Sequence, residues 1–142
     1  MGACVKATHS PRVSPEEKAL LQEIRASRRF PVANFELRSS KDPSVFSGAL
    51  ENVHLYSIDD TMEEVVRRGE LLERLARKGL VFLNYELRAY VQSDYAPYRE
   101  SDLFRELEAS MKEAKDEGFY FDYAFLKKGL AVLTPRGKYA AR

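Results

Sequence analysis

Residues 119–138 are the part of the chain that most limits its possible folds. The segment is rich in aromatic and aliphatic residues, and Lys128-Gly129 lies between two apolar stretches. A glycine-containing dipeptide between two such stretches is typical of a β-hairpin. From Tyr123 onward the sequence contains five basic residues and no acidic one. We therefore expect a C-terminal β-hairpin that leads into a basic segment.

Two helices are predicted from residues at their ends. The first begins at Ser14, where Glu17 completes a capping box. It ends before Pro31, because the residue that precedes a proline avoids helical angles. A later helix runs from Ser101 to Glu117 and has one apolar side, as expected for a helix that packs on a core.

A further helix between these two has a clear start and an ambiguous centre. Thr61 and Glu64 form a capping box at its start, and Gly79 is typical of a C-terminal cap. Gly69 lies between these ends. This glycine either costs an unbroken helix about 1 kcal/mol relative to alanine or marks a turn between two short helices.

Extended segments separate the predicted helices. The clearest alternation of side chains covers Val81–Val91, and weaker extended segments cover residues 32–38 and 50–58. With the C-terminal hairpin, these segments predict an α+β fold that has three main helices and a small antiparallel sheet.

Composition indicates a small protein of a reducing compartment. The 142 residues fit one domain, which we place at residues 14–142 after a flexible N-terminal tail of residues 1–13. The net charge is only +1, so attraction to a nucleic acid would have to come from local patches. The single cysteine, Cys4, fits a cytoplasmic location. No apolar run reaches the roughly 20 residues of a membrane span.

Two segments carry a resemblance to a known family. In residues 61–83 a short helix, a turn at Gly69 and a second helix would lead into a strand, and residues 129–138 are similar to the closing wing strand of many bacterial regulators. The chain thus resembles the winged-helix (winged helix-turn-helix) superfamily. The resemblance implies a DNA-binding, transcriptional-regulator-like protein. Its recognition helix would be either residues 70–78, with the 101–117 helix as an insertion, or the 101–117 helix itself.

The candidate nucleic-acid contacts are polar and basic side chains on the second helix and on the wing. Recognition helices present such side chains to base edges, and basic loops hold phosphates. The candidates are Glu73, Arg74, Arg77 and Lys78 on the helix, and Lys127, Lys128, Arg136 and Lys138 on the wing. The expected partner is double-stranded DNA. The alternative is that these residues bind no DNA. The helix residues would then form a solvated face, and the lysines would protect a sheet edge from pairing with another strand.

Two further groups of residues have open assignments. A second basic cluster either extends the nucleic-acid surface or stabilises a helix C-terminus while staying solvated. It contains Arg25, Arg28, Arg29 and Arg38. We expect Tyr85 in the core, whereas Tyr95 and Tyr98 are compatible with either the core or an interface.

Catalysis is not expected from this sequence. It lacks a closely spaced set of zinc ligands and the glycine patterns that bind phosphates or dinucleotides, and no cofactor is expected. His54 is the only candidate base outside the tail, and Asp59 and Asp60 are explained by helix capping. The alternative function is a protein–protein interaction or oligomerisation module, such as a homodimer, that binds no nucleic acid.

Overall fold

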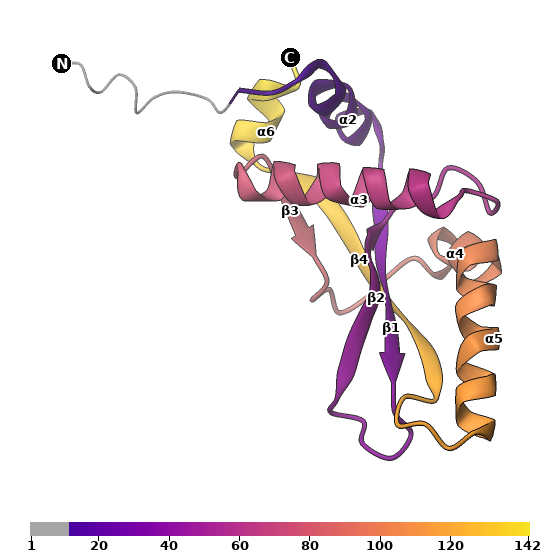
Figure 1. Cartoon of the computed structure of the whole chain (residues 1–142). Helices are drawn as coiled ribbons and strands as arrows, with labels where there is room; N and C mark the ends of the chain where they lie inside the picture. Colours follow the sequence, from indigo (N-terminus) through magenta and orange to yellow (C-terminus); the bar gives the residue numbers. More distant parts are fainter. Residues whose placement is uncertain (1–11) are drawn as a thin grey trace.

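Four antiparallel strands in the order β2-β1-β4-β3 form the centre of the fold (Figure 1). The computed structural model describes residues 12–142, which form an α+β structure. The strands are β1 (Pro31–Arg38), β2 (Phe46–Val53), β3 (Val81–Asn84) and β4 (Tyr123–Leu133). The helices are α2 (Pro15–Ala26), α3 (Met62–Arg77), α4 (Ala96–Glu100), α5 (Asp102–Asp116) and α6 (Pro135–Ala140), with a short 3₁₀ helix, η1 (Gln92–Asp94).

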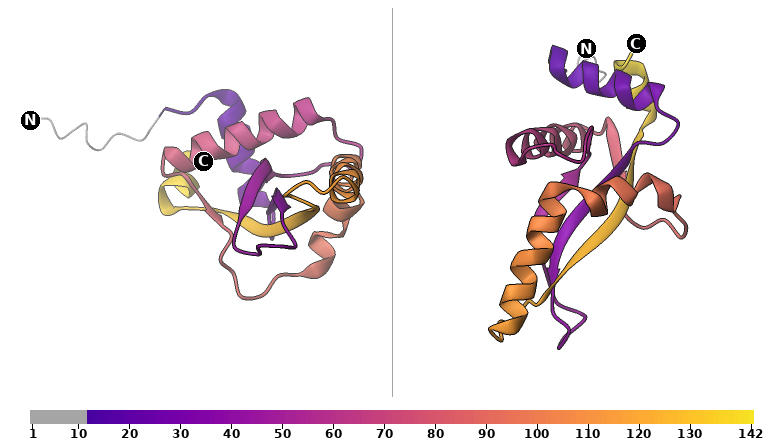
Figure 2. Two further views of the ribbon diagram at one scale, coloured as in Figure 1. Left: turned by 60° about the horizontal axis from the view of Figure 1, so that its bottom comes forward. Right: turned by 90° about the vertical axis from the view of Figure 1, so that its right-hand side faces the viewer.

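The helices differ in how they lie relative to the strands. In Figure 1, α3 runs across the strands, whereas α5 runs along them. The helices α2 and α6, which come from opposite ends of the described chain, lie together at one end of the molecule (Figure 2). The β1–β2 turn and the α5–β4 loop lie at the other end (Figure 1).

The predicted starts of the three main helices are confirmed. The hydroxyl of Ser14 accepts from the Glu17 amide at 3.1 Å, and the Glu17 carboxylate accepts from the Ser14 amide at 2.8 Å. Thr61 and Glu64 form the same reciprocal box at α3. Ser101 caps α5 through a single bond from the Phe104 amide. Each cap satisfies backbone donors that have no partner within the helix.

Two clusters of buried apolar side chains hold the helices to the sheet. The first lies between α2, α3, α6 and the sheet, and includes Leu21, Val32, Leu72, Leu80 and Ala131. The second lies under α4 and α5 and includes Phe35, Val65, Tyr95, Tyr98, Phe104 and Leu126. Tyr95 and Tyr98 therefore belong to the core, and the Tyr95 hydroxyl donates to the Gly129 carbonyl at 2.6 Å.

The turn considered at Gly69 does not form, because α3 is one unbroken helix. Gly69 instead lets α3 approach β2 closely. A Cβ atom at this position would lie 2.8 Å from the carbonyl oxygen of Glu51. The helix-turn-helix expected in residues 61–83 is therefore wrong, since the glycine serves a contact between distant segments rather than a bend.

The predicted C-terminal hairpin is also wrong. Tyr123–Leu133 form a single strand, β4, which pairs with β1 on one side and β3 on the other. Lys128 and Gly129 lie in the middle of this strand. A Cβ atom on Gly129 would lie 2.5 Å from the ring of Tyr85, so the glycine makes room for the tyrosine. A glycine within a strand often marks such a close approach.

Two other segments differ from expectation near β4. The strand expected over residues 81–91 ends at Asn84, whose side chain accepts from the Glu86 amide at 2.9 Å and so turns the chain. The expected closing wing strand ends at Leu133, and α6 follows it. Thr134 caps α6 by accepting from the Gly137 amide at 3.0 Å.

The predicted limits of two strands and of the N-terminal tail can also be compared with the structure. The 32–38 segment is confirmed as β1, whereas β2 lies several residues before the predicted 50–58 segment. Residues 1–11 of the predicted tail lie outside the described part of the chain. Val13, the last residue of that predicted tail, packs against the first apolar cluster.

Replacing Gly69 with alanine tests the contact between α3 and β2. The added methyl group would gain about 1 kcal/mol of helix propensity. It would also meet a backbone oxygen that cannot rotate away, and overpacking of this kind costs about 1–3 kcal/mol. We expect urea denaturation to show a net loss in the free energy of unfolding.

Gly48→Ala is the matched control, because its new Cβ would meet only the Glu51 side chain at 3.7 Å. We expect this control to change the free energy of unfolding by less than about 0.5 kcal/mol. A Gly69→Ala protein more stable than wild type would contradict the close packing of α3 on β2.

Candidate functional site

Two of the candidate nucleic-acid contacts on α3 are held by a buried carboxylate of α2. Arg74 Nε lies 3.2 Å from Glu17 Oε2, and Lys78 Nζ lies 2.8 Å from Glu17 Oε1. Burial alone would raise the pKa of Glu17. The hydrogen bonds from Lys78, the Ser14 amide and Arg74 outweigh it and lower the pKa to about 2. These two cations therefore connect α3 to α2.

The other two candidates on α3 bind each other. Arg77 Nη1 lies 2.8 Å from Glu73 Oε1, one helical turn away, and both side chains are exposed. With Arg74 and Lys78 also engaged, none of the four side chains expected to read DNA lacks a charged partner.

The four candidates of the expected wing separate into two places. Lys127 and Lys128 lie in the middle of β4, whereas Arg136 and Lys138 lie on α6. The location of α6 beside α2 brings Lys138 next to Arg25, Arg28 and Arg29 of the second basic cluster, whereas Arg38 lies elsewhere, at the end of β1. Sequence patterns could not predict this combination, because the two segments lie at opposite ends of the described chain.

A groove of about 540 Å³ lies where Lys138 meets that cluster. We call it the cationic groove. Its apolar floor comes from the end of α2, the segment before β1 and the end of β4, and includes Ile24, Phe30, Leu130, Val132 and Leu133. Its charged lining consists of Arg25, Arg28, Arg29, Lys138 and Arg142. Its volume lies within the range usual for ligand sites.

The positive charge of the cationic groove is largely uncompensated. Arg29 binds Asp94 through two nitrogens, at 2.6 and 3.2 Å. The other four cations form no ion pair with any residue in the described part of the chain, and no acidic residue lines the groove. Such an arrangement attracts an anion electrostatically.

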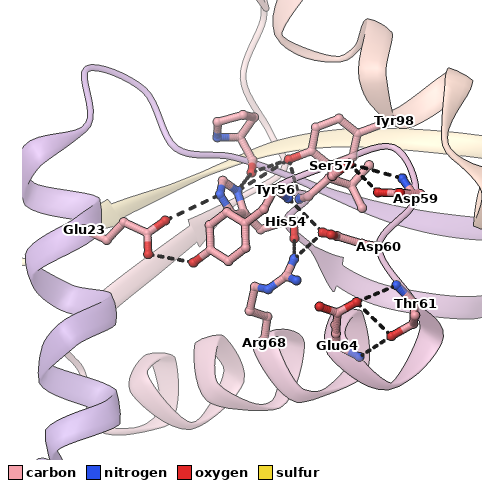
Figure 3. A network of polar contacts seen from close by, with 12 residues as sticks. Glu23, His54, Tyr56, Ser57, Asp59, Asp60, Thr61, Glu64, Arg68 and Tyr98 are labelled. Carbon is pink, nitrogen blue, oxygen red and sulfur yellow. Dashed lines mark hydrogen bonds and ion pairs between the residues drawn. The ribbon is translucent and has the colours of Figure 1, made fainter.

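One residue of the groove floor, Phe30, packs on a buried polar network that includes His54. Figure 3 shows this network. The ring of Phe30 stacks on the ring of His54, with their centroids 3.7 Å apart. His54 Nδ1 lies 2.7 Å from the Pro31 carbonyl oxygen, to which the Tyr98 hydroxyl also donates at 2.9 Å. Burial lowers the pKa of His54, which favours the neutral ring that donates from Nδ1.

A buried ion pair continues this network toward α3 (Figure 3). Arg68 Nη1 lies 2.9 Å from Asp60 Oδ2 and also donates to the His54 carbonyl. The Arg68 guanidinium lies 4.2 Å from the centroid of the Tyr56 ring, and the Tyr56 hydroxyl donates to Glu23 at 2.6 Å. Asp60 is thus an ion-pair partner, a role that the helix-capping interpretation of the sequence missed.

The polar side chains of this network are paired with one another and with the backbone. Every buried side-chain nitrogen and oxygen among the described residues has a hydrogen-bond partner. His54 is only 8% exposed, and its Nε2 lies 4.0 Å from Glu23, beyond hydrogen-bond distance. Residues 12–142 contain no group of three or more potential ligands that could hold a metal ion. Cys4 and His9 lie outside the described residues.

No helix in the described part of the chain is long and apolar enough to cross a membrane.

Comparisons with known proteins give one structural neighbour. No protein-family model matches the sequence, and none of the curated proteins matches it. The neighbour is a solved structure of an uncharacterized protein from the hydrocarbon-degrading marine bacterium Alcanivorax borkumensis SK2. Its TM-score is 0.44 at 12% sequence identity, and the alignment covers 90% of this chain and 83% of that chain.

Replacing Glu17 with glutamine tests the clamp between α2 and α3. Glutamine can keep the capping box, so the change removes mainly the charge. Because the folded-state pKa of about 2 lies below the ordinary value of 4.5, the charge stabilises the fold above about pH 5. We expect Glu17→Gln to lower the free energy of unfolding by about 2 kcal/mol at pH 7, allowing for solvent around Arg74 and Lys78.

The difference between the two proteins should shrink as the pH falls from about 5 toward 2, where wild-type Glu17 also becomes neutral. Chemical denaturation at several pH values measures this difference. Glu73→Gln is the control, since it breaks an exposed pair and should cost less than about 0.5 kcal/mol. A Glu17→Gln effect of the same size at every pH would contradict the clamp.

Proposed function

We propose that this chain is a nucleic-acid-binding protein whose cationic groove holds the phosphate backbone. The observation that carries the proposal is a set of four cations around an apolar floor. None of the four forms an ion pair within the described residues. Phosphate contacts of arginine and lysine supply most of the affinity for nucleic acids that does not depend on sequence.

The distribution of charge supports a local contact. The whole chain has a net charge of only +1, so it has little general attraction for polyanions. Positive charge is instead concentrated where α6 packs beside the end of α2. Both Arg25 and Arg28 are exposed there, and so are Lys138 and Arg142.

The proposal retains the nucleic-acid partner that the winged-helix resemblance implies but changes the contacting surface. The basic side chains of α3 have carboxylate partners, and the segment expected to form the wing is an interior strand followed by α6. The cationic groove takes their place as the binding surface. A regulator-like role in transcription would then depend on this groove.

A second candidate function is interaction with another protein or with a second copy of the chain. It rests on exposed aromatic side chains at the starts of β2 and β4 and in the α5–β4 loop. These segments lie at the end of the molecule away from α2 and α6 (Figure 1). The side chains are Phe46, Phe119, Tyr120 and Tyr123. Aromatic residues are enriched at protein interfaces. Under this alternative, the chain would bind no nucleic acid.

Neutralising the cationic groove tests the proposed function. We would titrate fluorescent oligonucleotides of random sequence, both single-stranded and duplex, at ~50 and ~200 mM salt and follow their anisotropy. The test variant combines Arg25→Gln, Arg28→Gln and Lys138→Gln. We expect its Kd at low salt to rise at least about tenfold, and the slope of log K against log salt to become shallower by about 2.

The control variant combines Arg105→Gln, Lys112→Gln and Lys115→Gln, which removes the same charge from the exposed side of α5. It should bind almost like wild type. Equal losses in the two variants would contradict a local site. Absence of binding by the wild type at low salt, or displacement by polyglutamate as efficient as by unlabelled oligonucleotide, would favour a protein partner instead.

A further inference from the structure

We propose that the cationic groove holds a single nucleic-acid strand, and that this strand continues along β4 into a second cationic hollow. The inference rests on the proposed function. It names the form of nucleic acid that is bound and adds a second part to the site.

The second hollow has about 460 Å³ and lies at the middle of β4. No acidic residue of the described chain lines it. Arg38, Arg99, Lys127 and Lys128 surround it, together with Tyr85 and Tyr90. Arg38 is compensated by Glu36 at 2.6 Å, whereas Arg99 and Lys127 form no ion pair within residues 12–142. Two of the candidate wing residues thus belong to this hollow.

The second hollow is adjacent to the cationic groove. The strand β4 contributes residues 130–133 to the groove and residues 125–128 to the hollow. The 3₁₀ helix η1 connects their edges. Its last residue, Asp94, binds Arg29 of the groove, and its first residue, Gln92, accepts a hydrogen bond from Lys128 of the hollow. The 3₁₀ helix η1, with Asp94 in an ion pair to Arg29, therefore lies between the two edges.

The distance along β4 from the second hollow to the far end of the cationic groove fits a short strand. At about 3.3 Å per residue, the part of β4 from residue 125 to 133 extends over about 26 Å. About eight stacked nucleotides cover that distance at 3.4 Å each, and fewer do so when the strand is extended. The surface is therefore longer than a single phosphate or mononucleotide needs.

Exposed aromatic rings beside the cationic groove favour a ligand with exposed bases. The floor of the cationic groove is apolar, and Phe82, which is 57% exposed, pairs across the sheet with Val132 of that floor. Tyr139 is 61% exposed beside Lys138. Bases of a single strand can stack on such rings, whereas a duplex keeps its bases enclosed and presents its backbone. Apolar surface next to cations therefore matches a single strand better than a duplex.

The test compares three labelled probes with the wild-type protein: oligo(dT) of ~4 nucleotides, oligo(dT) of ~12 nucleotides and a duplex of ~12 base pairs. We expect the longer single strand to bind at least about tenfold more tightly than the duplex at ~50 mM salt. The short strand should bind mainly in the cationic groove, which has more uncompensated cations.

Variants of each part then separate the two contacts. Combining Arg99→Gln with Lys127→Gln should weaken binding of the longer strand at least about fivefold and leave the short strand unchanged, because each lost phosphate contact weakens binding severalfold. Arg25→Gln with Arg28→Gln should weaken both strands. Arg105→Gln with Lys112→Gln removes the same charge from α5 as a control. Thermal unfolding confirms that each variant is folded.

The outcomes distinguish this inference from the proposed function. A duplex that binds as tightly as the longer strand would overturn the single-strand inference and leave nucleic-acid binding intact. An unchanged affinity of the longer strand for the Arg99→Gln and Lys127→Gln variant would overturn the extension into the second hollow. Failure of all three probes to bind wild type would remove both proposals.

Photocrosslinking tests the path of the strand directly. Crosslinks from a strand that contains bromouracil should map to residues 82–90 and 138–142. Crosslinks confined to α3 would contradict the proposed path.

Discussion

The buried pair of Arg68 and Asp60 anchors the polar network on which Phe30 of the cationic groove packs. It ties α3 to the segment after β2, and Arg68 also holds the carbonyl of His54. His54 in turn stacks on Phe30, which forms part of the groove floor. Removing one partner would leave a buried charge, which typically costs 3–5 kcal/mol. A buried polar network therefore supports Phe30, one residue of the apolar groove floor.

The helix starts could be predicted from sequence because a cap is local. Ser14 and Thr61 each bond residues three positions away, so a short pattern contains the whole interaction. The glycines could not be read in this way. Gly69 faces the backbone of Glu51, and Gly129 faces the ring of a tyrosine from the loop after β3. Each glycine is required by a contact with a distant segment, whereas the local sequence pattern predicts a turn at both positions.

The same difference between local interactions and contacts across the chain explains how much of the site could be predicted. The sequence identified basic residues but not which of them have partners. Arg74 and Lys78 find Glu17, 57 and 61 positions away, and are removed from the candidate surface. Arg25 and Lys138 gain importance only because α6 packs beside α2. Charge is therefore visible in the sequence, whereas its compensation is a property of the folded structure.

The interior position of β4 has a consequence for how the molecule folds. The strand pairs with β1 and β3, and it contributes Ala131 to the first apolar cluster and Leu126 to the second. Its register joins Pro31 to Leu130, near opposite ends of the chain. A long loop must close before these contacts form, and the loss of chain entropy on closing it slows folding. Neither apolar cluster can be completed before β4 has paired with β1. The parts of the molecule that contain the two clusters should therefore fold and unfold as a single cooperative unit.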